Sequence, residues 1–262
     1  MAVALITGAS SGIGEQFAYA LARERYPLAL TARREERLQA VAEQAQKLGA
    51  PAAHIFVLDL ARHSAPAELH DQVRWAGLEI EMLVNNAGFG ARGRFDRLPL
   101  ERELEQVDVN IRALVALTRL FLPAMISARR GTIINLASTA GFQAVPYMAT
   151  YAATKSFVVN FSLALNRELR ETGVHVMALC PGATRTEFQS VAGTDGTMPS
   201  FVYMDAQTVV AQALRAARKN RAIRINGALN VIATESQRLA PRWLVARIAA
   251  MFFRPPGLIK GR

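Results

Sequence analysis

Short, uninterrupted runs of apolar residues alternate along this chain with longer segments in which apolar residues recur every three or four positions. The short runs predict strands that are buried on both faces of a parallel sheet, and the periodic segments predict helices. The expected strands are residues 3–7, 28–31, 55–58, 82–85, 132–137, 174–179 and 222–225. The expected helices are residues 13–24, 35–48, 65–75, 100–126, 150–171, 206–218 and 241–253. This alternation favours one doubly wound α/β domain over residues 1–262, with about seven parallel strands and helices on both faces of the sheet.

The composition agrees with a single folded domain. With 262 residues, 51% of them hydrophobic, the chain can bury a large core without disulfides or a structural metal. Its single cysteine, Cys180, excludes an internal disulfide, and its four histidines lack the spacing of metal ligands, so we expect no metal site. No signal-peptide pattern is visible, and no run reaches the roughly 18 to 20 uncharged apolar residues that span a membrane. We therefore expect a cytoplasmic protein.

The net charge of +10 comes entirely from the C-terminal fifth of the chain. Residues 213–262 contain 11 of the 31 lysine and arginine residues but one of the 21 acidic residues, Glu235. Charges of opposite sign cancel over the rest of the sequence. A basic excess confined to one end differs from the broad basic surface of a nucleic-acid-binding fold, so we expect no nucleic-acid partner and look for a local partner or surface instead.

A glycine-rich turn joins the first expected strand to the first expected helix. It reads Thr7, Gly8, Ala9, Ser10, Ser11, Gly12, Ile13 and Gly14. Glycine permits a tight turn and a close approach of the backbone to a pyrophosphate, whose negative charge is favoured at a helix N-terminus. The position of the turn directly after a strand predicts a dinucleotide site, although such a pattern by itself also occurs in simple loops.

The spacing Thr-Gly-x-x-x-Gly-x-Gly opens a series of motifs that resembles the classical short-chain dehydrogenase/reductase family in order and spacing. The series covers residues 7–186 and continues with Asp59, Asn85-Asn86-Ala87-Gly88, Asn110, Ser138, Tyr151-x-x-x-Lys155 and Pro181-Gly182-x-x-x-Thr186. The resemblance implies a Rossmann-type fold and an enzyme that moves a hydride between a nicotinamide cofactor and a carbonyl or alcohol carbon. It also implies a set of cofactor-binding residues, which are Gly8, Ser10, Ser11, Gly12, Ile13, Gly14, Asp59, Leu60, Asn86, Ala87, Gly88, Tyr151, Lys155, Pro181, Gly182, Thr184 and Thr186.

Four side chains of this series carry the expected chemistry. Tyr151 and Lys155 are four positions apart on an expected helix and so share one face. The ammonium and the positive nicotinamide ring both favour phenolate, so we expect the phenol pKa to fall below its ordinary value of about 10, and Tyr151 to act as general acid or base. Ser138, with Thr139 as a neighbouring rival, is expected to hydrogen-bond the carbonyl oxygen. By resemblance, Lys155 also holds the nicotinamide ribose, and Asn110 holds a water that relays protons to Lys155.

Each of these residues also has a purely structural interpretation. Tyr151 can be a packed helix tyrosine and Lys155 a solvated lysine. Asn85 and Asn86 can be turn residues, and Asp59 can be a helix cap. The complete series favours catalysis; the alternatives are a protein that senses dinucleotides without turnover and a membrane-docked binding protein on the same fold.

The end of the second expected strand indicates which nucleotide is used. An acidic residue at this position binds the ribose 2′-hydroxyl in relatives that prefer NAD. Residues 31–34 instead read Thr-Ala-Arg-Arg, and a guanidinium fork suits a 2′-phosphate. We therefore expect NADP rather than NAD, with Arg33 as the main contact, Arg34 as the second, and help from Ser10 or Ser11. Two solvated arginines at the start of a helix are the alternative.

We expect the segments after the fourth, fifth and sixth strands to form the wall of the substrate pocket. Its candidates are apolar or aromatic, which suggests a lipophilic carbonyl compound. They are Phe89, Phe142, Tyr147, Phe188, Met198 and Phe201. Residues 189–199, rich in Gly, Ser and Thr, are either a mobile lid or an ordinary surface loop.

Residues 236–262 form a basic amphipathic extension. The helix expected at 241–253 carries Trp243 and Phe252 among Arg242 and Arg247. This helix can pack on the domain or cap the substrate pocket, join a subunit interface, or lie peripherally on an anionic membrane. The tail resembles that of one uncharacterised bacterial branch of the family, loosely similar to 3-ketoacyl and hydroxysteroid reductases. The family resemblance further implies a homo-oligomer, a dimer or a tetramer.

Overall fold

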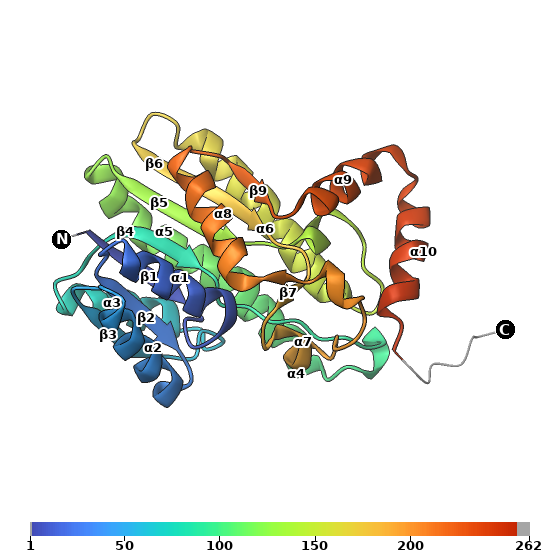
Figure 1. The fold of residues 1–262 in the computed structure, drawn as a ribbon, viewed down its shortest axis with the longest axis horizontal. Coiled ribbons are helices and arrows are strands. Elements are labelled where there is room, and N and C mark those ends of the chain that lie inside the picture. The colour runs from blue at the N-terminus through green and yellow to red at the C-terminus, as the bar shows by residue number, and fades with distance from the viewer. Residues whose placement is uncertain (1, 256–262) are drawn as a thin grey trace.

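Seven parallel strands form the centre of the computed structural model, which describes residues 2–255 (Figure 1). These strands are β1 (Ala2–Thr7), β2 (Leu28–Ala32), β3 (Ala53–Val57), β4 (Glu79–Asn85), β5 (Gly131–Leu136), β6 (Val174–Cys180) and β9 (Ile223–Ile225). Their order in the sheet is β3-β2-β1-β4-β5-β6-β9, so the winding reverses between β1 and β4. The sequence-based prediction of a doubly wound parallel sheet is confirmed, with strand boundaries shifted by up to three residues.

Helices cover both faces of this sheet. One face is covered by α1 (Gly12–Arg23), α2 (Glu35–Lys47) and α8 (Ala206–Arg218), and the other by α3 (Ala65–Trp75), α5 (Leu114–Ser127) and α6 (Ala149–Glu168). The apolar stripe of each helix meets the strand residues beneath it. Phe17 and Leu21 of α1 pack on one face, for example, and Leu117 of α5 packs on the other. This burial on both sides explains why the strands are continuous apolar runs in the sequence.

The helix expected over residues 100–126 is not a regular α-helix throughout. It consists of α4 (Leu100–Val107), the π-helical turn η2 (Asp108–Ala113) and α5. The stretch Leu100–Ser127 is also long and apolar enough to span a membrane by length and composition. However, it carries Arg112 and Arg119, and α5 packs against β4, β5 and α3 in the core of the molecule.

The segments after β6 contain short elements that the apolar pattern did not predict. They are β7 (Thr184–Arg185), α7 (Phe188–Ala192), β8 (Met204–Asp205) and α9 (Ala228–Ser236), and β7 and β8 pair in a small second sheet. Four short 3-10 turns complete the described elements: η1 (Phe95–Arg97), η3 (Thr139–Phe142), η4 (Ser200–Val202) and η5 (Gln237–Leu239). The last helix, α10 (Arg242–Phe253), lies within its predicted range. Residues 256–262 of the expected extension lie outside the described residues.

Candidate active site

A cleft of about 500 Å³ opens at the carboxyl ends of the central strands, where the winding of the sheet reverses. Open α/β sheets bind their ligands at this place. Most of the residues predicted for the site line the cleft, namely Gly8, Ser10, Ser11, Gly12, Ile13, Arg33, Arg34, Asp59, Leu60, Asn86, Ala87, Gly88, Ser138, Tyr151, Lys155, Pro181, Gly182, Thr184 and Thr186. Two predicted residues, Gly14 and Asn110, support the wall from behind. Among residues 2–255, no group of three His, Cys, Asp or Glu side chains could hold a metal ion.

The glycine turn after β1 disfavours side chains at three positions, two for their backbone conformation and one for lack of space. Gly8 and Gly12 have φ values of +64° and +60°, a left-handed conformation that glycine adopts at little cost. A Cβ atom on Gly14 would lie 2.4 Å from the carbonyl oxygen of Gly8. Ser11, at the start of α1, makes no side-chain cap, so the first N–H groups of this helix are available to an anion. The turn therefore fits the pyrophosphate of a dinucleotide.

Thr7 and Asn86 hold the glycine turn against the segment after β4. The Thr7 hydroxyl accepts hydrogen bonds of 2.9 Å from the backbone N–H groups of Asn86 and Ala87. The Asn86 side-chain amide donates to the carbonyl oxygens of Thr7 at 2.8 Å and Gly8 at 3.1 Å. Asn86 lines the cleft as predicted, but its amide group acts on the backbone of the turn.

Tyr151 and Lys155 lie one turn apart on α6, and both side chains are buried. The hydroxyl of Ser138, which follows β5, accepts a hydrogen bond from the Ala140 N–H at 3.1 Å and faces the same cleft as the Tyr151 phenol. The Lys155 Nζ atom lies 5.8 Å from the centroid of the Tyr151 ring and donates to the carbonyl oxygen of Leu136 at 2.7 Å. A hydroxyl, a phenol and an ammonium group thus meet on one wall of the cleft. Thr139, the rival of Ser138, belongs to the η3 turn and also lines the cleft.

Burial shifts the pKa values of the phenol and the ammonium in opposite directions because it disfavours the charged form of each. It raises the pKa of Tyr151 to about 12, against a smaller lowering by the hydrogen bond with Ser138. It lowers the pKa of Lys155 from its ordinary 10.5 to about 8. The lowered pKa of Tyr151 expected from the sequence is therefore not found in the protein by itself, where burial dominates. Tyr151 keeps its proton at neutral pH, which is the state that a general acid requires.

Asn110 lies in the π-helical turn η2, behind Phe89 of the cleft wall. Its amide donates to the carbonyl oxygen of Phe89 and to the Thr154 hydroxyl, each at 3.0 Å, and its Oδ1 atom accepts from the Phe89 N–H at 3.1 Å. A Cβ on Gly88 would lie 2.8 Å from Asn110 Oδ1 and 3.4 Å from Lys155 Nζ. The glycine therefore allows Asn110 and Lys155 to lie close together. Single π turns are frequent at functional sites because they redirect one residue of a helix.

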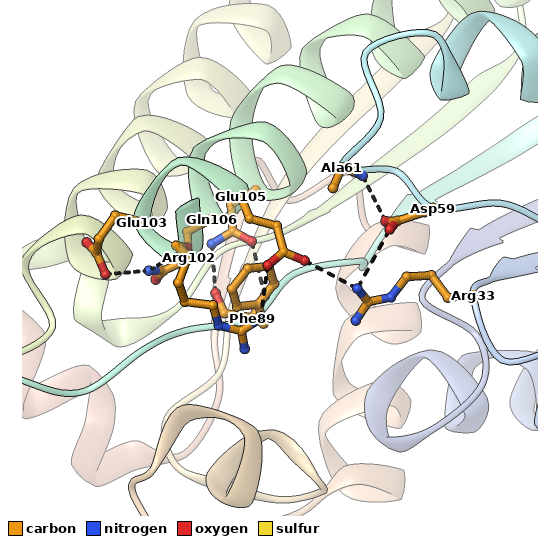
Figure 2. Close-up of polar contacts among 9 residues, drawn as sticks. Arg33, Asp59, Ala61, Phe89, Arg102, Glu103, Glu105 and Gln106 are labelled. Carbon is orange, nitrogen blue, oxygen red and sulfur yellow. Dashed lines mark hydrogen bonds and ion pairs between the residues drawn. The ribbon is translucent and has the colours of Figure 1, made fainter. Parts of the chain in front are cut away.

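Arg33 extends between two carboxylates at the far end of the cleft (Figure 2). Its Nη1 atom lies 3.2 Å from Glu105 on α4 and 3.8 Å from Asp59, whose other oxygen accepts a hydrogen bond from the Ala61 N–H. Glu105 also pairs with Arg102, which stacks over the ring of Phe89. Neither Glu105 nor Arg102 was predicted, because no local pattern brings α4 beside β2.

Arg34 lies across the entrance of the glycine turn. Its Nη2 atom donates to the hydroxyl of Ser11 at 2.9 Å, to that of Ser10 at 3.3 Å and to Glu187 at 2.7 Å. The guanidinium and the hydrogen bond with Ser11 hold the pKa of Glu187 below its ordinary value. Arg34 therefore joins the turn after β1 to the segment before α7. Glu187, 153 positions away in the chain, was not predicted.

The substrate end of the cleft agrees only in part with the prediction. Phe89, Phe188 and Met198 line it. Phe142 instead packs against the core cluster that contains Val158, and Tyr147, which has a φ of +68°, lines a separate smaller cavity. The side chain of Phe201 lies outside the described residues. Further apolar residues of the wall were not predicted because their positions depend on loop conformation; they are Val145, Met148, Val191, Tyr203 and Phe253.

The C-terminal helices contact the site at two points. A Cβ on Gly182 would lie 2.3 Å from the side chain of Asn230 on α9, so this helix packs directly behind the Pro181-Gly182 turn. Phe253, the last residue of α10, lines the cleft and packs against the buried cluster that contains Tyr151 and Met148. Of the three positions considered for the tail, the described part packs on the domain and reaches the pocket at its end.

Comparison with known proteins agrees with this geometry. Residues 2–196 match the family model described as short chain dehydrogenase. A sulfoacetaldehyde reductase from Chromohalobacter salexigens is 36% identical over 80% of this chain and 84% of its own length. A very-long-chain 3-oxoacyl-CoA reductase from Phaeosphaeria nodorum is 32% identical over 75% of this chain and 59% of its own length. A short-chain dehydrogenase from Sphingobium yanoikuyae, solved with NADPH, superposes with a TM-score of 0.82 at 33% identity and covers 91% of this chain and 94% of its own.

The matched region extends from the glycine turn through the phenol–ammonium pair to the turn after β6. It therefore contains every motif on which the resemblance was based. The chain belongs to the classical short-chain dehydrogenase/reductase family, and it is an oxidoreductase that uses a pyridine nucleotide to interconvert carbonyl and alcohol groups.

Proposed function

We propose that this protein transfers a hydride between NADP and the carbonyl or alcohol carbon of a lipophilic substrate, such as a ketone, an aldehyde or a 3-oxoacyl compound. The observation that carries the proposal is that Ser138, Tyr151 and Lys155, the last two one helical turn apart, line one cleft that ends at a glycine turn. When bound, the nicotinamide supplies or accepts the hydride.

Side chains of the protein donate the proton and stabilise the carbonyl oxygen of the substrate. Tyr151, which is protonated at neutral pH, donates its proton to the carbonyl oxygen during reduction. The Ser138 hydroxyl donates a hydrogen bond to the same oxygen and stabilises the charge that develops there. Lys155 holds the nucleotide ribose and replaces the proton lost by Tyr151. Asn110 holds the backbone of Phe89 and the hydroxyl of Thr154, the neighbour of Lys155 on α6, through its hydrogen bonds.

Turnover of NADPH with a panel of carbonyl compounds tests this assignment. Tyr151→Phe keeps the ring and removes the proton donor, so kcat is expected to fall by at least about a hundredfold while NADPH binding is retained. Tyr26→Phe, at a tyrosine remote from the cleft, is the matched control. A protein that binds NADPH but turns over no carbonyl compound in either form would instead support the dinucleotide-sensing alternative.

The preference for NADP over NAD is supported by the two arginines at the end of β2. Arg33 and Arg34 line the end of the cleft nearest β2 and β3, and the solved relative from Sphingobium yanoikuyae contains NADPH. Each guanidinium already has a carboxylate partner, Glu105 for Arg33 and Glu187 for Arg34. A 2′-phosphate can replace the carboxylates because a guanidinium fork binds either anion.

The ratio of kcat/KM for NADPH over NADH measures this preference. The Arg33 side chain is 58% exposed, so solvent screening limits the expected loss in Arg33→Ala to about 1–2 kcal/mol, or roughly a five- to thirtyfold lower ratio. Arg74→Ala, on the exposed side of α3 and away from the cleft, is the control. An unchanged ratio in Arg33→Ala would reject Arg33 as the selector.

A lipophilic substrate is supported by the wall of the cleft beyond Tyr151. This wall includes the apolar side chains of Phe89, Val145, Met148 and Phe188. The 3-oxoacyl-CoA reductase among the relatives supports the same substrate class. We expect kcat/KM to rise with the length of the apolar chain in a series of ketones, and a preference for short anionic aldehydes would contradict the assignment.

A homo-oligomer is supported by apolar residues that α4 and α6 leave exposed. Phe157 and Leu163 of α6 are 39% and 37% exposed, and Leu100 and Leu104 of α4 are 63% and 54% exposed. Exposed large apolar side chains are common at subunit interfaces. Light scattering after size exclusion gives the mass directly, and Phe157→Asp is expected to dissociate the assembly if α6 forms the interface.

We further propose a cytoplasmic protein with peripheral membrane contact, which is supported by exposed side chains of the last helix. Trp243, Met251 and Phe252 are 66%, 70% and 48% exposed, and Arg242 and Arg247 lie on the same short helix. Such a combination binds anionic interfaces. Flotation with anionic vesicles at low salt tests the idea; absence of flotation, or equal flotation of Trp243→Ser, would remove it.

A further inference from the structure

Arg92 connects three backbone segments at the substrate end of the cleft. It follows β4 by seven residues, and its guanidinium donates three hydrogen bonds to backbone carbonyl oxygens. Nε donates to Phe253 at 2.8 Å, Nη2 to Arg254 at 2.6 Å and Nη1 to Gly193 at 3.1 Å. The acceptors lie 161, 162 and 101 positions away in the sequence, so this contact exists only in the tertiary structure.

The acceptors of these hydrogen bonds are the C-terminal ends of two helices. Phe253 is the last residue of α10 and Arg254 is its C-cap, while Gly193 is the C-cap of α7. Carbonyl groups at a helix end have no partner within the helix, and the helix dipole places negative charge there. A planar guanidinium with five N–H donors can satisfy several such carbonyls at once, which a lysine ammonium cannot do with the same geometry.

Few other contacts bury α10. Ala249 is the only fully buried residue of this helix, which lies at the edge of the molecule away from the sheet (Figure 1). Phe253 nevertheless turns inward, lines the cleft and packs with Phe188 against the cluster that includes Tyr151. Its neighbour Phe252 is 48% exposed. The hydrogen bonds from Arg92 therefore hold the one turn of α10 that places an aromatic ring in the substrate pocket.

We propose that Arg92 is a positioning residue that fastens the ends of α10 and α7 over the substrate pocket, and that it thereby makes Phe253 a specificity-determining residue. This inference rests on the proposed function for the identity of the pocket. The ring of Phe253 offers its apolar surface to the part of a substrate beyond the carbonyl group. Substrates with a long apolar chain gain this contact, and short ones do not reach it.

Steady-state kinetics with a long and a short methyl ketone test the specificity. In Arg92→Ala and in Phe253→Ala, KM for the long ketone is expected to rise roughly tenfold, with kcat and the kinetics of the short ketone nearly unchanged. Arg94→Ala, which removes an exposed arginine from the same loop, and Phe252→Ala are the matched controls. Since Arg92 acts through Phe253, the double variant should lose no more than either single variant.

Limited proteolysis tests the fastening without any turnover. Arg242 and Arg247 offer trypsin two cleavage sites within α10, and Arg92→Ala is expected to speed cleavage there at least about fivefold, because the helix is released more often. Arg92→Lys should restore part of the protection, and Arg94→Ala should behave as wild type. Equal urea midpoints for these variants would show that local rather than global unfolding is measured.

The two measurements separate failure of this inference from failure of the proposed function. Wild-type cleavage rates in Arg92→Ala overturn the fastening. Faster cleavage with unchanged selectivity between the ketones overturns the specificity role of Phe253. If wild type turns over neither ketone although it binds NADPH, the proposed substrate class is wrong, and the proteolysis result still decides whether Arg92 holds α10.

Discussion

Replacing Lys155 by methionine tests the balance between stability and catalysis at the active site. The buried ammonium has a pKa of about 8 in the folded protein, compared with its ordinary value of 10.5. That difference corresponds to about 3 kcal/mol of destabilisation when the lysine is protonated. The methionine variant removes this destabilisation. It also loses the hydrogen bond to the Leu136 carbonyl, which costs the variant roughly 1 kcal/mol. Lys155→Met is therefore expected to be about 2 kcal/mol more stable than wild type at pH 7, and inactive.

The pH dependence of this difference follows from linkage. Between pH 8 and 10.5 the unfolded chain binds more protons at Lys155 than the folded protein does, so the stability of wild type rises with pH in this window. Below pH 8 the cost of burying the ammonium is present in full. The raised pKa of Tyr151, about 12, acts in both proteins and cancels to first order. The advantage of the variant is thus expected to shrink by about 2 kcal/mol between pH 7 and pH 9.5.

Urea unfolding followed by far-UV circular dichroism at pH 7 and pH 9.5 gives the free energies of unfolding of both proteins. Lys47→Met, at an exposed lysine near the end of α2, controls for the loss of a charge without the burial. A difference between Lys155→Met and wild type that does not change with pH would refute the argument, because constant packing effects of the methionine cannot imitate a titration.

Three further predictions concern the cofactor turn, the core and the arginine cluster. Gly14→Ala places a Cβ 2.4 Å from the Gly8 carbonyl oxygen, so nucleotide binding, measured by calorimetry, should be lost while the fold persists in circular dichroism. Asn135 is fully buried, donates a hydrogen bond to Ser162 at 3.0 Å and accepts one from Asn85 at 2.9 Å. Asn135→Ala should lower the free energy of unfolding in urea by about 2–3 kcal/mol, and a decrease below about 1 kcal/mol would contradict the importance of this network. Glu105→Gln removes a carboxylate that competes with a 2′-phosphate for Arg33, so Kd for NADPH should fall by about two- to fivefold with Kd for NADH unchanged; weaker NADPH binding would instead mean that Glu105 positions Arg33.

The order of strands and helices, and the polar side chains that line the cleft beside the glycine turn, could be predicted from local sequence. Strands buried on both faces must be continuous apolar runs, and the polar groups that follow them gather at one edge of a parallel sheet. Ser138, Tyr151 and Lys155 therefore had to lie near the glycine turn once the order of the strands was known. The interruption of the helix at Asn110 left no such signal, because a π turn changes the hydrogen bonds but not the apolar pattern.

Other features depend on contacts between residues far apart in the chain. The carboxylates that face Arg33 and Arg34 come from Glu105 and Glu187, 72 and 153 positions away. The same holds for the guanidinium of Arg92 at the end of α10. Spacing alone did not predict that burial raises the pKa of Tyr151 and lowers that of Lys155 in the protein by itself, because both shifts depend on how completely the surrounding chain excludes water.

By itself, the sequence determined the sheet, the place of the glycine turn and which polar side chains gather beside it, because periodicity and motif spacing are local properties of the chain. Only the tertiary structure decided which charges pair, how strongly the phenol and the ammonium are buried, and that Phe253 lines the cleft. These depend on the packing of segments whose separation in sequence carries no information about their distance in space.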